Sequence, residues 1–249
     1  MLVSLFGLIN PAGAQQGTVT CWAVADGDVG NDGLNNEGVP DTLVRIDDAL
    51  GAATATVVGA VGAITSTDAE AMAIRRGDAT PIYAWETGAG LFTIDPVTGV
   101  SQGAASFQVG GDKVEGLGWA NTDDTDLSND ILYVIRTNGD VTGYNDAGAV
   151  VVATQNPTTA ALNEGADVAW DPATDTVYAV ITANSDVSEV VIVNGGGPAG
   201  GPTDLDMEGL GFELGGQMFG TTGNDGADAL HTINKASGAA TLPRGVRAT

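Results

Sequence analysis

A short phrase recurs along this chain and constrains its fold more than any other feature of the sequence. The phrase begins with a glutamate that opens a short apolar run, and a second apolar run follows it. Its four copies begin at residues 69–74 (AEAMAI), 114–120 (VEGLGWA), 163–170 (NEGADVAW) and 207–212 (MEGLGF). With the glutamates as register marks, the copies are 115 − 70 = 45, 164 − 115 = 49 and 208 − 164 = 44 residues apart. This period, built from short strands, is typical of propeller blades with four strands each.

Each copy divides into four expected strands, which we name A to D from the centre of the ring outward. In the copy that begins at residue 114, strand A spans 114–120, strand B 131–135, strand C 141–145 and strand D 149–154. The turn between strands C and D begins with Asp or Asn, as at Asp95 and Asn234, and ends with Gly. A tight hairpin favours these residues, because the Asp or Asn side chain caps the turn and Gly adopts a positive φ. The Gly-rich stretch 195–202 is expected to lie between repeats.

A partial fifth copy precedes the four complete ones. Residues 18–26 are expected to form an inner strand and residues 42–59 strands C and D, but no Glu-Gly phrase marks a strand A. We therefore predict an all-β fold: a five-bladed β-propeller of four antiparallel strands per blade, with its ring closed by terminal strands. The missing strand has three candidate sources, because an open edge must be paired. They are residues 2–9 (LVSLFGLI), residues 246–249 (VRAT) and a neighbouring molecule.

The N-terminal segment, residues 1–14, carries an apolar run followed by the small residues Ala12, Gly13 and Ala14. This order is typical of a secretory signal, although no Lys or Arg precedes the run. The run is too short to span a bilayer as a helix. We expect residues 1–14 to be either signal-like or a retained strand, residues 15–249 to form a single propeller domain, and the protein to be secreted or held at the cell surface.

The charge of the chain excludes some partners. There are 32 Asp and Glu residues against 8 Lys and Arg, which gives a net charge of −24. Such a surface repels nucleic acid and anionic lipid, so we expect neither as a partner. Either a cation bound at clustered carboxylates or a generally solvated acidic surface accounts for the excess. Cys21 is the only cysteine, so an internal disulfide is impossible, and we expect Cys21 to pack as a small apolar residue.

The repeats resemble those of a group of secreted bacterial propellers. The resemblance lies in the pairing of E-G-L-x-[FW] with [LI]-[FLV]-x-[IV]-D-P-x-T-G, which in that group reads EGLAF…LY…IDPxTG. Some members of the group are called phytase-like. The resemblance covers most of the chain and implies a propeller, but it says little about function, since propellers host lectins, hydrolases, dehydrogenases and scaffolds. It assigns the same register to the four glutamates and marks Asp95 and Asn234 as the C–D turns, while Ala71 departs from the pattern by replacing its glycine.

The glutamates are candidate calcium ligands. At one height around the channel they would form a ring of oxygen ligands for Ca²⁺, which takes about six to eight oxygens. The alternative is that each carboxylate accepts hydrogen bonds from backbone N–H groups and joins blade to blade. The members of this predicted ring are Glu70, Glu115, Glu164 and Glu208.

Two loops are rich in acid and form further candidates. The first is residues 26–41, which lack the strict EF-hand register because Gly30 occupies its fifth position. Its candidate metal ligands are Asp26, Asp28, Asp32, Glu37 and Asp41. The second loop supplies Asp123, Asp124, Asp126 and Asp130. Calcium is the candidate cofactor of the first loop. The alternative is that these loops are solvated acidic connections.

Catalysis finds little support in the sequence. His231 is the only histidine, no Gly-x-Ser-x-Gly motif is present, and the few basic residues make a phosphate-binding cluster hard to assemble. We therefore do not expect an enzyme. Tryptophans at 22, 85, 119 and 170 could present sugar-binding platforms, but Trp119, Trp170 and Phe212 occupy equivalent strand A positions and are expected to fill the core between blades.

The sequence thus favours a non-catalytic extracellular structural or interaction propeller. An incomplete first blade and an apolar N-terminal strand suggest self-assembly by strand addition between molecules, up to a filament. The expected partners are further copies of the chain or other cell-surface and matrix components. A calcium-dependent hydrolase of phosphoesters or glycosides and a carbohydrate-binding propeller are the alternatives.

Overall fold

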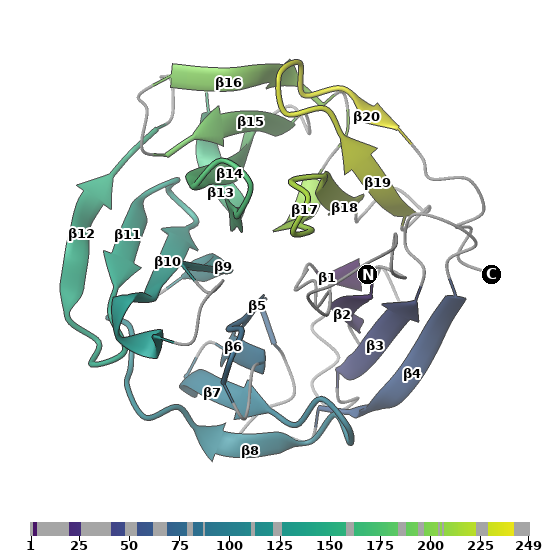
Figure 1. Ribbon diagram of the computed structural model, residues 1–249, viewed down its shortest axis with the longest axis vertical. Coiled ribbons are helices and arrows are strands. Elements are labelled where there is room, and N and C mark those ends of the chain that lie inside the picture. Colours follow the sequence, from purple (N-terminus) through teal and green to yellow (C-terminus); the bar gives the residue numbers. More distant parts are fainter. Residues whose placement is uncertain are drawn as a thin grey trace.

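Five four-stranded antiparallel sheets surround a central axis in the computed structural model of the chain (Figure 1). This confirms the prediction of a five-bladed β-propeller. The structure describes residues 2–3, 20–25, 41–47, 54–61, 69–78, 82–86, 88–110, 113–121, 126–157, 162–183, 188–193, 197–203, 205, 207–222 and 229–241.

The blades follow one another in sequence, and within each blade the strands run in chain order from the axis to the rim. Blade 1 contains β1 (Leu2–Val3), β2 (Cys21–Ala25), β3 (Thr42–Asp47) and β4 (Thr54–Ala60). Blade 2 contains β5 (Ala71–Ile74), β6 (Ile82–Glu86), β7 (Gly90–Ile94) and β8 (Ser101–Ala104). Blade 3 contains β9 (Val114–Ala120), the 3-10 helix η1 (Leu127–Asn129), β10 (Ile131–Arg136), β11 (Val141–Tyr144) and β12 (Val150–Gln155). Blade 4 contains β13 (Leu162–Asp171), β14 (Thr176–Ala183), β15 (Ser188–Ile192) and β16 (Gly197–Pro202). Blade 5 contains β17 (Met207–Phe212), β18 (Met218–Thr222), β19 (Ala229–Ile233) and β20 (Ala240–Thr241).

The inner strand of blade 1 comes from the N-terminal segment of the same chain. In β1, Leu2 pairs with Ala25 and Val3 pairs with Val24 of β2. The strand also contacts β17, the inner strand of blade 5. The ring is therefore closed by a terminal strand, and of the three candidate sources the structure uses the first.

The Gly-rich stretch 195–202 is not a break between repeats, as the sequence suggested. Its residues Gly197–Pro202 form β16, the outermost strand of blade 4, which pairs with β15. An outer strand needs ladder hydrogen bonds on one side only, so it tolerates prolines that a central strand would exclude.

The C–D turns have the chemistry that the sequence predicted. The Oδ1 atom of Asp95 accepts hydrogen bonds from the backbone N–H groups of Val97 and Thr98, at 2.7 and 3.0 Å. In the same way Asn234 accepts from Ala236 and Ser237. Each turn ends in a glycine with φ of 72–75°, which a residue with a side chain adopts rarely; these glycines are Gly99, Gly148 and Gly238.

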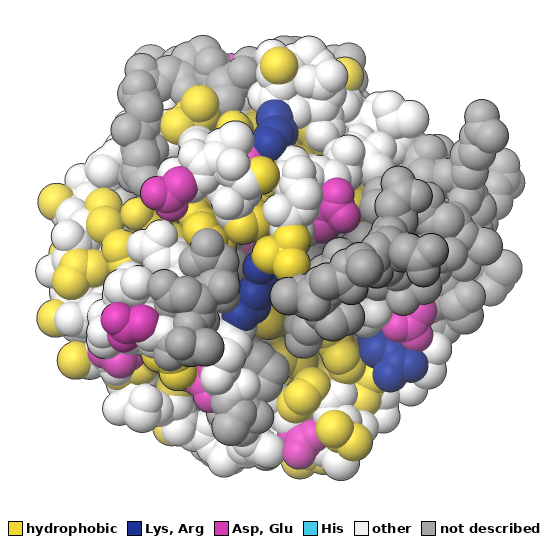
Figure 2. Space-filling view, in the orientation of Figure 1, with side chains coloured by type: hydrophobic (Ala, Val, Ile, Leu, Met, Phe, Trp, Pro, Cys, Tyr) yellow, Lys and Arg dark blue, Asp and Glu magenta, His cyan; other side chains and the backbone are white. Residues whose placement is uncertain are grey.

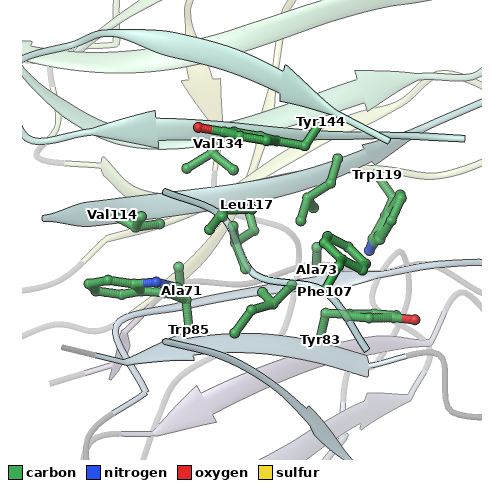
Figure 3. Close-up of a cluster of buried hydrophobic side chains, with 13 residues drawn as sticks. Ala71, Ala73, Tyr83, Trp85, Phe107, Val114, Leu117, Trp119, Val134 and Tyr144 are labelled. Carbon is green, nitrogen blue, oxygen red and sulfur yellow. The ribbon is translucent and has the colours of Figure 1, made fainter. Parts of the chain in front are cut away.

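The core lies between neighbouring blades. An aromatic residue on strand A packs against a tyrosine on strand B of the preceding blade, as Trp119 does with Tyr83 at 5.2 Å between ring centroids and Phe212 with Tyr178 at 5.3 Å. Figure 3 shows the cluster between blades 2 and 3, in which Phe107 completes the aromatic contacts. The prediction that these strand A aromatics fill the inter-blade core is confirmed.

No tryptophan is exposed as a sugar-binding platform would have to be. The four indoles, Trp22, Trp85, Trp119 and Trp170, are between 4% and 8% exposed. The platform interpretation was therefore wrong, because the repeat pattern of a propeller turns these side chains toward the adjacent blade. Among the helices that the structure describes, none has the length and apolar character needed to cross a membrane.

Candidate functional site

The strand A glutamates do not all share one height in the ring. In blades 3 and 5 the aromatic residue follows the glutamate by 119 − 115 = 4 and 212 − 208 = 4 residues, but in blade 4 by 170 − 164 = 6. Strand pairing agrees, because Glu115 and Glu208 are the extra residues at a β-bulge and Ala166 takes that place in blade 4. The predicted register of Glu164 is thus two residues wrong, because two more residues separate the glutamate from the aromatic residue in blade 4 than in blades 3 and 5. Glu70 fits the register of Glu115.

The glutamates that share the register are half-buried and engaged with the protein. Glu115 accepts a hydrogen bond from Thr137 Oγ1 at 2.6 Å, and Glu70 and Glu208 also have interaction partners. Within the described residues, no group of three or more His, Cys, Asp or Glu side chains is placed to hold a metal ion. Calcium binding by the glutamates stays a prediction, and the side chain of Glu164 lies outside the description.

The acidic loops lie mostly outside the described residues, which include neither Asp26, Asp28, Asp32 and Glu37 nor Asp123 and Asp124. Two of their carboxylates are described and buried. Asp41 is 2% exposed, and its Oδ2 accepts a hydrogen bond from the backbone N–H of Ala69, which leads into blade 2, at 2.6 Å. Asp130 forms the ion pair described next. Each therefore joins two blades, and calcium binding by the first loop stays a prediction.

Arg75 and Asp130 form a buried ion pair between blades 2 and 3. Arg75 follows the last residue of β5 and is 5% exposed, while Asp130 precedes β10 and is 1% exposed. The Nε atom of Arg75 donates to Asp130 Oδ2 at 2.7 Å, and its Nη2 donates to the carbonyl oxygen of Leu127. Arg75 also lies 3.9 Å from Asp78 and 4.0 Å from Asp146, which is in the C–D turn of blade 3.

The aromatic core supports this ion pair. The guanidinium of Arg75 lies 4.4 Å from the ring centre of Trp119, in cation–π contact. Tyr83 donates its hydroxyl hydrogen to Asp78 at 2.7 Å. Burial, together with this bond to a carboxylate, raises the pKa of Tyr83 to about 12. The indole Nε1–H of Trp119 has no conventional acceptor among the described residues and faces the perpendicular ring of Phe107, as Figure 3 shows.

A second ion pair occupies the equivalent position between blades 4 and 5 with its charges exchanged. Asp171, which ends β13 and is fully buried, accepts from Lys235 Nζ at 2.5 Å. Arg75 and Asp171 both directly follow the last core position of strand A. Asp146 and Lys235 both directly follow the Asn of a C–D turn. A seam is the contact between two neighbouring blades. We refer to the pair of Arg75 with Asp130 and the pair of Asp171 with Lys235 as cross-seam ion pairs.

The seam between blades 5 and 1 has a different composition. Glu213 holds the position of Arg75 and Asp171, and within the described residues it forms no ion pair. Across the seam lies buried Cys21 of β2, whose thiol pKa is raised by burial and, to a smaller extent, by the negative charge of Glu213. Burial raises the pKa of the Glu213 carboxyl, although the backbone N–H of Gln217 partly compensates. Burial likewise raises the pKa of the Cys21 thiol, which makes it a poor nucleophile.

Asp167 joins the inner strands of blades 4 and 5. It is fully buried, and its Oδ2 accepts from the backbone N–H of Leu210 at 2.7 Å while its Oδ1 accepts from Val168 at 2.8 Å. His231 is also buried, on β19, and its Nε2 lies 3.5 Å from Thr222 Oγ1. Burial lowers the pKa of His231, so the imidazole is neutral at pH 7.

The geometry therefore assigns the buried charges to holding the ring together. Among described residues, five of the six buried Asp, Glu and Arg side chains contact a neighbouring blade: Asp41, Arg75, Asp130, Asp167 and Asp171. Sequence reasoning missed Arg75, Asp167, Asp171 and Lys235 as a group. For Arg75, Asp171 and Lys235 the signal is positional, because opposite charges recur directly after the last core position of strand A and directly after the Asn of the C–D turn.

Comparison with known proteins supports the fold and nothing narrower. No family model matches the chain, and no curated protein is significantly similar to it in sequence. Among solved structures, a chain in the crystal structure of a nidogen/laminin complex superimposes with a TM-score of 0.52 and 10% identity. The match covers 96% of this chain and 78% of that chain. At this identity the likeness places the protein among β-propellers by fold alone.

Proposed function

We propose that this protein is a non-catalytic interaction propeller that works outside the cell and associates with further copies of itself. The observation that carries the proposal is the use of its buried charges. Five of the six buried Asp, Glu and Arg side chains of the described part contact a neighbouring blade. Catalytic groups need a shared site with access to substrate, whereas these groups are spread over the seams of the ring.

The rim of the ring supports association between copies. The outer strands β4, β8, β12, β16 and β20 contain no charged residue, although the whole chain carries a net charge of −24. The large apolar side chains that are exposed among the described residues are Val57, Val97, Val100, Val150 and Val151. Val150 and Val151 are on β12, and Figure 2 shows hydrophobic side chains along the margin where β12 lies.

An uncharged rim matters because two chains of −24 repel each other at close range. Rings that approach side by side bring their uncharged outer strands together. The nidogen/laminin structure, in which a chain shares this fold, is a complex of two proteins. These features favour a protein partner for this propeller, and a second copy is the partner that its own surface accommodates.

The test is the mass of the intact chain in solution. Light scattering coupled to gel filtration should show particles larger than the monomer, in a fraction that rises with protein concentration. A chain that remains monomeric at every concentration contradicts the proposal. A parallel screen with generic phosphoester and glycoside substrates, with EDTA and with added Ca²⁺, tests the alternative. Calcium-dependent turnover that is lost in Glu115→Gln would contradict the non-catalytic proposal and support the calcium-dependent hydrolase.

A further inference from the structure

We infer that two copies of this chain bind each other through β12, the outer strand of blade 3, and that β12 of each copy faces β12 of the other in a closed pair. This inference rests on the proposed self-association and names its surface and its partner. The partner is chemically defined as an uncharged, valine-rich strand, Val150–Gln155 of a second copy.

Among the described residues, the exposed valines gather at two places on the rim of the ring. One place is β12, where Val150 and Val151 are adjacent and each is at least half exposed. The other is the contact between β4 of blade 1 and the C–D turn of blade 2, where a Cβ at Gly59 would lie 2.1 Å from the carbonyl oxygen of Thr98. The valines of this second place are Val57, Val97 and Val100. Isolated exposed valines are ordinary, but neighbouring ones indicate a contact surface.

Charge distinguishes the two places. The carboxylate of Asp95 lies beside Val97, because its Oδ1 accepts a hydrogen bond from the Val97 backbone N–H at 2.7 Å. Backbone hydrogen bonds from Val97 and Thr98 lower the pKa of Asp95, which is therefore ionised at pH 7. By contrast, residues 147–163 contain no Asp, Glu, Lys or Arg. A symmetric contact around Val97 would bring two carboxylates together, whereas a symmetric contact at β12 brings uncharged residues together.

The carboxylates at the two ends of β12 interact within their own ring. Asp146, in the turn before the strand, lies 4.0 Å from Arg75 Nη2. Beyond the other end, Asp140 Oδ1 accepts a hydrogen bond from Asn156 Nδ2 at 3.0 Å. Because β12 itself carries no charge, a charged segment of another protein would gain no ion pair on the strand. A second copy of β12 brings no charge that needs one, which favours it as the occupant.

The geometry of β12 determines the form of the contact. The strand ends the sheet of blade 3 at the rim, and no other described strand pairs with its outer edge (Figure 1). Its register with β11 shifts twice, between Val150 and Val152 and between Val152 and Gln155. Such bulges twist an edge and interrupt a regular ladder to a further strand. The two copies are therefore joined by side chains, with Val150 and Val151 of one copy against the same residues of the other. A patch that binds its own copy is isologous, so the pair closes as a dimer.

The size of this contact predicts a weak dimer. Two strands of six residues bury less surface than the roughly 1,200–2,000 Å² of stable complexes. Light scattering should therefore show a mass that rises with protein concentration to twice the monomer mass and then stays constant. Growth beyond the dimer overturns the closed pair and leaves the proposed self-association standing.

A charge placed on β12 tests the surface. Val151→Lys puts an ammonium group into the contact from each copy and should weaken the dimer by about tenfold or more, measured as its dissociation constant. The matched control is Val97→Lys, which makes the same change at a valine that is 81% exposed and should alter the constant by less than about twofold. Both variants reduce the net negative charge, so a general charge effect would strengthen association instead.

The outcomes of this test are distinguishable. If Val151→Lys dimerises like the parent chain, or if Val97→Lys loses the dimer as well, the inference is overturned while the proposed function stands. If the parent chain is monomeric at every concentration, the proposed function itself fails.

Cysteine cross-linking tests the symmetry of the pair. In an isologous contact the two copies present the same residue to each other, so Val151→Cys should give a covalent dimer with a short bismaleimide. Val97→Cys is the control, because its more exposed thiol meets another copy only by random collision. Cys21 is fully buried and present in both chains. At concentrations that give dimers, Val151→Cys should cross-link many times faster, and equal rates overturn the inference. Unfolding curves of all the variants check that each ring is folded.

Discussion

The seams between blades 2 and 3 and between blades 4 and 5 hold their blades by ion pairs of opposite polarity. In the first, the cation Arg75 directly follows strand A and the anions come from the next blade. In the second, the anion Asp171 comes from strand A and the cation Lys235 from the next blade. Blades of similar shape can dock in the wrong order, and a mismatched seam would bring like charges together. The exchanged polarity therefore disfavours docking between the wrong blades.

The two ion pairs also differ in burial, which sets how much each one matters. Arg75 and Asp130 are 5% and 1% exposed, whereas Lys235 is 28% exposed beside fully buried Asp171. Among the described residues, the seam between blades 3 and 4 contains neither kind of ion pair. There Gly118 lies so close to Val168 and Ala169 of blade 4 that a methyl group would come within 2.4 Å of the Val168 carbonyl oxygen. Charge and close backbone contact are thus alternative means of fixing neighbouring blades.

Removal of the buried cation should have the largest effect. Arg75→Met keeps an apolar stem over Trp119 but leaves the carboxylate of Asp130 buried without its guanidinium. We expect a loss of about 3–5 kcal/mol in the free energy of unfolding, measured by urea titration. The control is Arg45→Met, which breaks an exposed pair with Asp47 and should cost less than about 1 kcal/mol. If both variants lost the same free energy of unfolding, burial would not determine how much an ion pair stabilises the ring.

The glycine contact should come next in size. In Gly118→Ala the added methyl group meets backbone atoms of blade 4, which cannot move aside as a side chain can. We expect a loss of about 1–3 kcal/mol. Gly110→Ala is the matched control, because a Cβ at Gly110 meets no atom within 4 Å. If both alanines prove neutral, the seam between blades 3 and 4 does not depend on close contact.

These seams also show what the sequence could and could not predict. The period, the C–D turn residues and the strand A aromatics predicted the blades, because each follows from local pattern. The ion pairs were missed because Arg75 and Asp130 are 55 residues apart and Asp171 and Lys235 are 64 apart, and no local rule joins them.

The errors at Glu164 and at residues 195–202 have equally physical causes. In blade 4 the glutamate lies two residues farther from the strand A aromatic residue than in blades 3 and 5, which places Glu164 beyond the bulge at Ala166. The Gly- and Pro-rich strand β16 pairs on one side only, so its composition gave no sign of a strand. In both places the missing information was the pairing of strands, which single residues do not encode.

The half-buried ion pair gives a smaller expected effect. In Lys235→Met, Asp171 keeps the hydrogen bonds from Ala173 N and Thr174 Oγ1, so its carboxylate remains partly compensated. We expect a loss of about 1–2 kcal/mol, less than for Arg75→Met, in the same urea titration. Lys113→Met removes an exposed lysine and serves as the control. A loss as large as that of Arg75→Met would mean that polarity, and not burial, sets the strength of a cross-seam ion pair.

Removal of the Glu213 charge from the seam between blades 5 and 1 should raise the free energy of unfolding instead of lowering it. This is the smallest of the expected changes. Because burial raises the pKa of Glu213, the folded ring favours the protonated carboxyl, and this contribution to stability is lost as pH rises through the folded pKa. Glu213→Gln is neutral at every pH and should therefore be more stable than the parent chain at pH 7, by less than about 1 kcal/mol, and equal to it near pH 4. Urea unfolding at both pH values measures the difference, in which the titration of all other groups cancels. Glu208→Gln, which removes one charge from the same blade, controls for net charge. A gain at pH 4 as large as that at pH 7 would show that the ionised carboxylate does not weaken this seam, and the contrast with the two ion-paired seams would then rest on strand pairing alone.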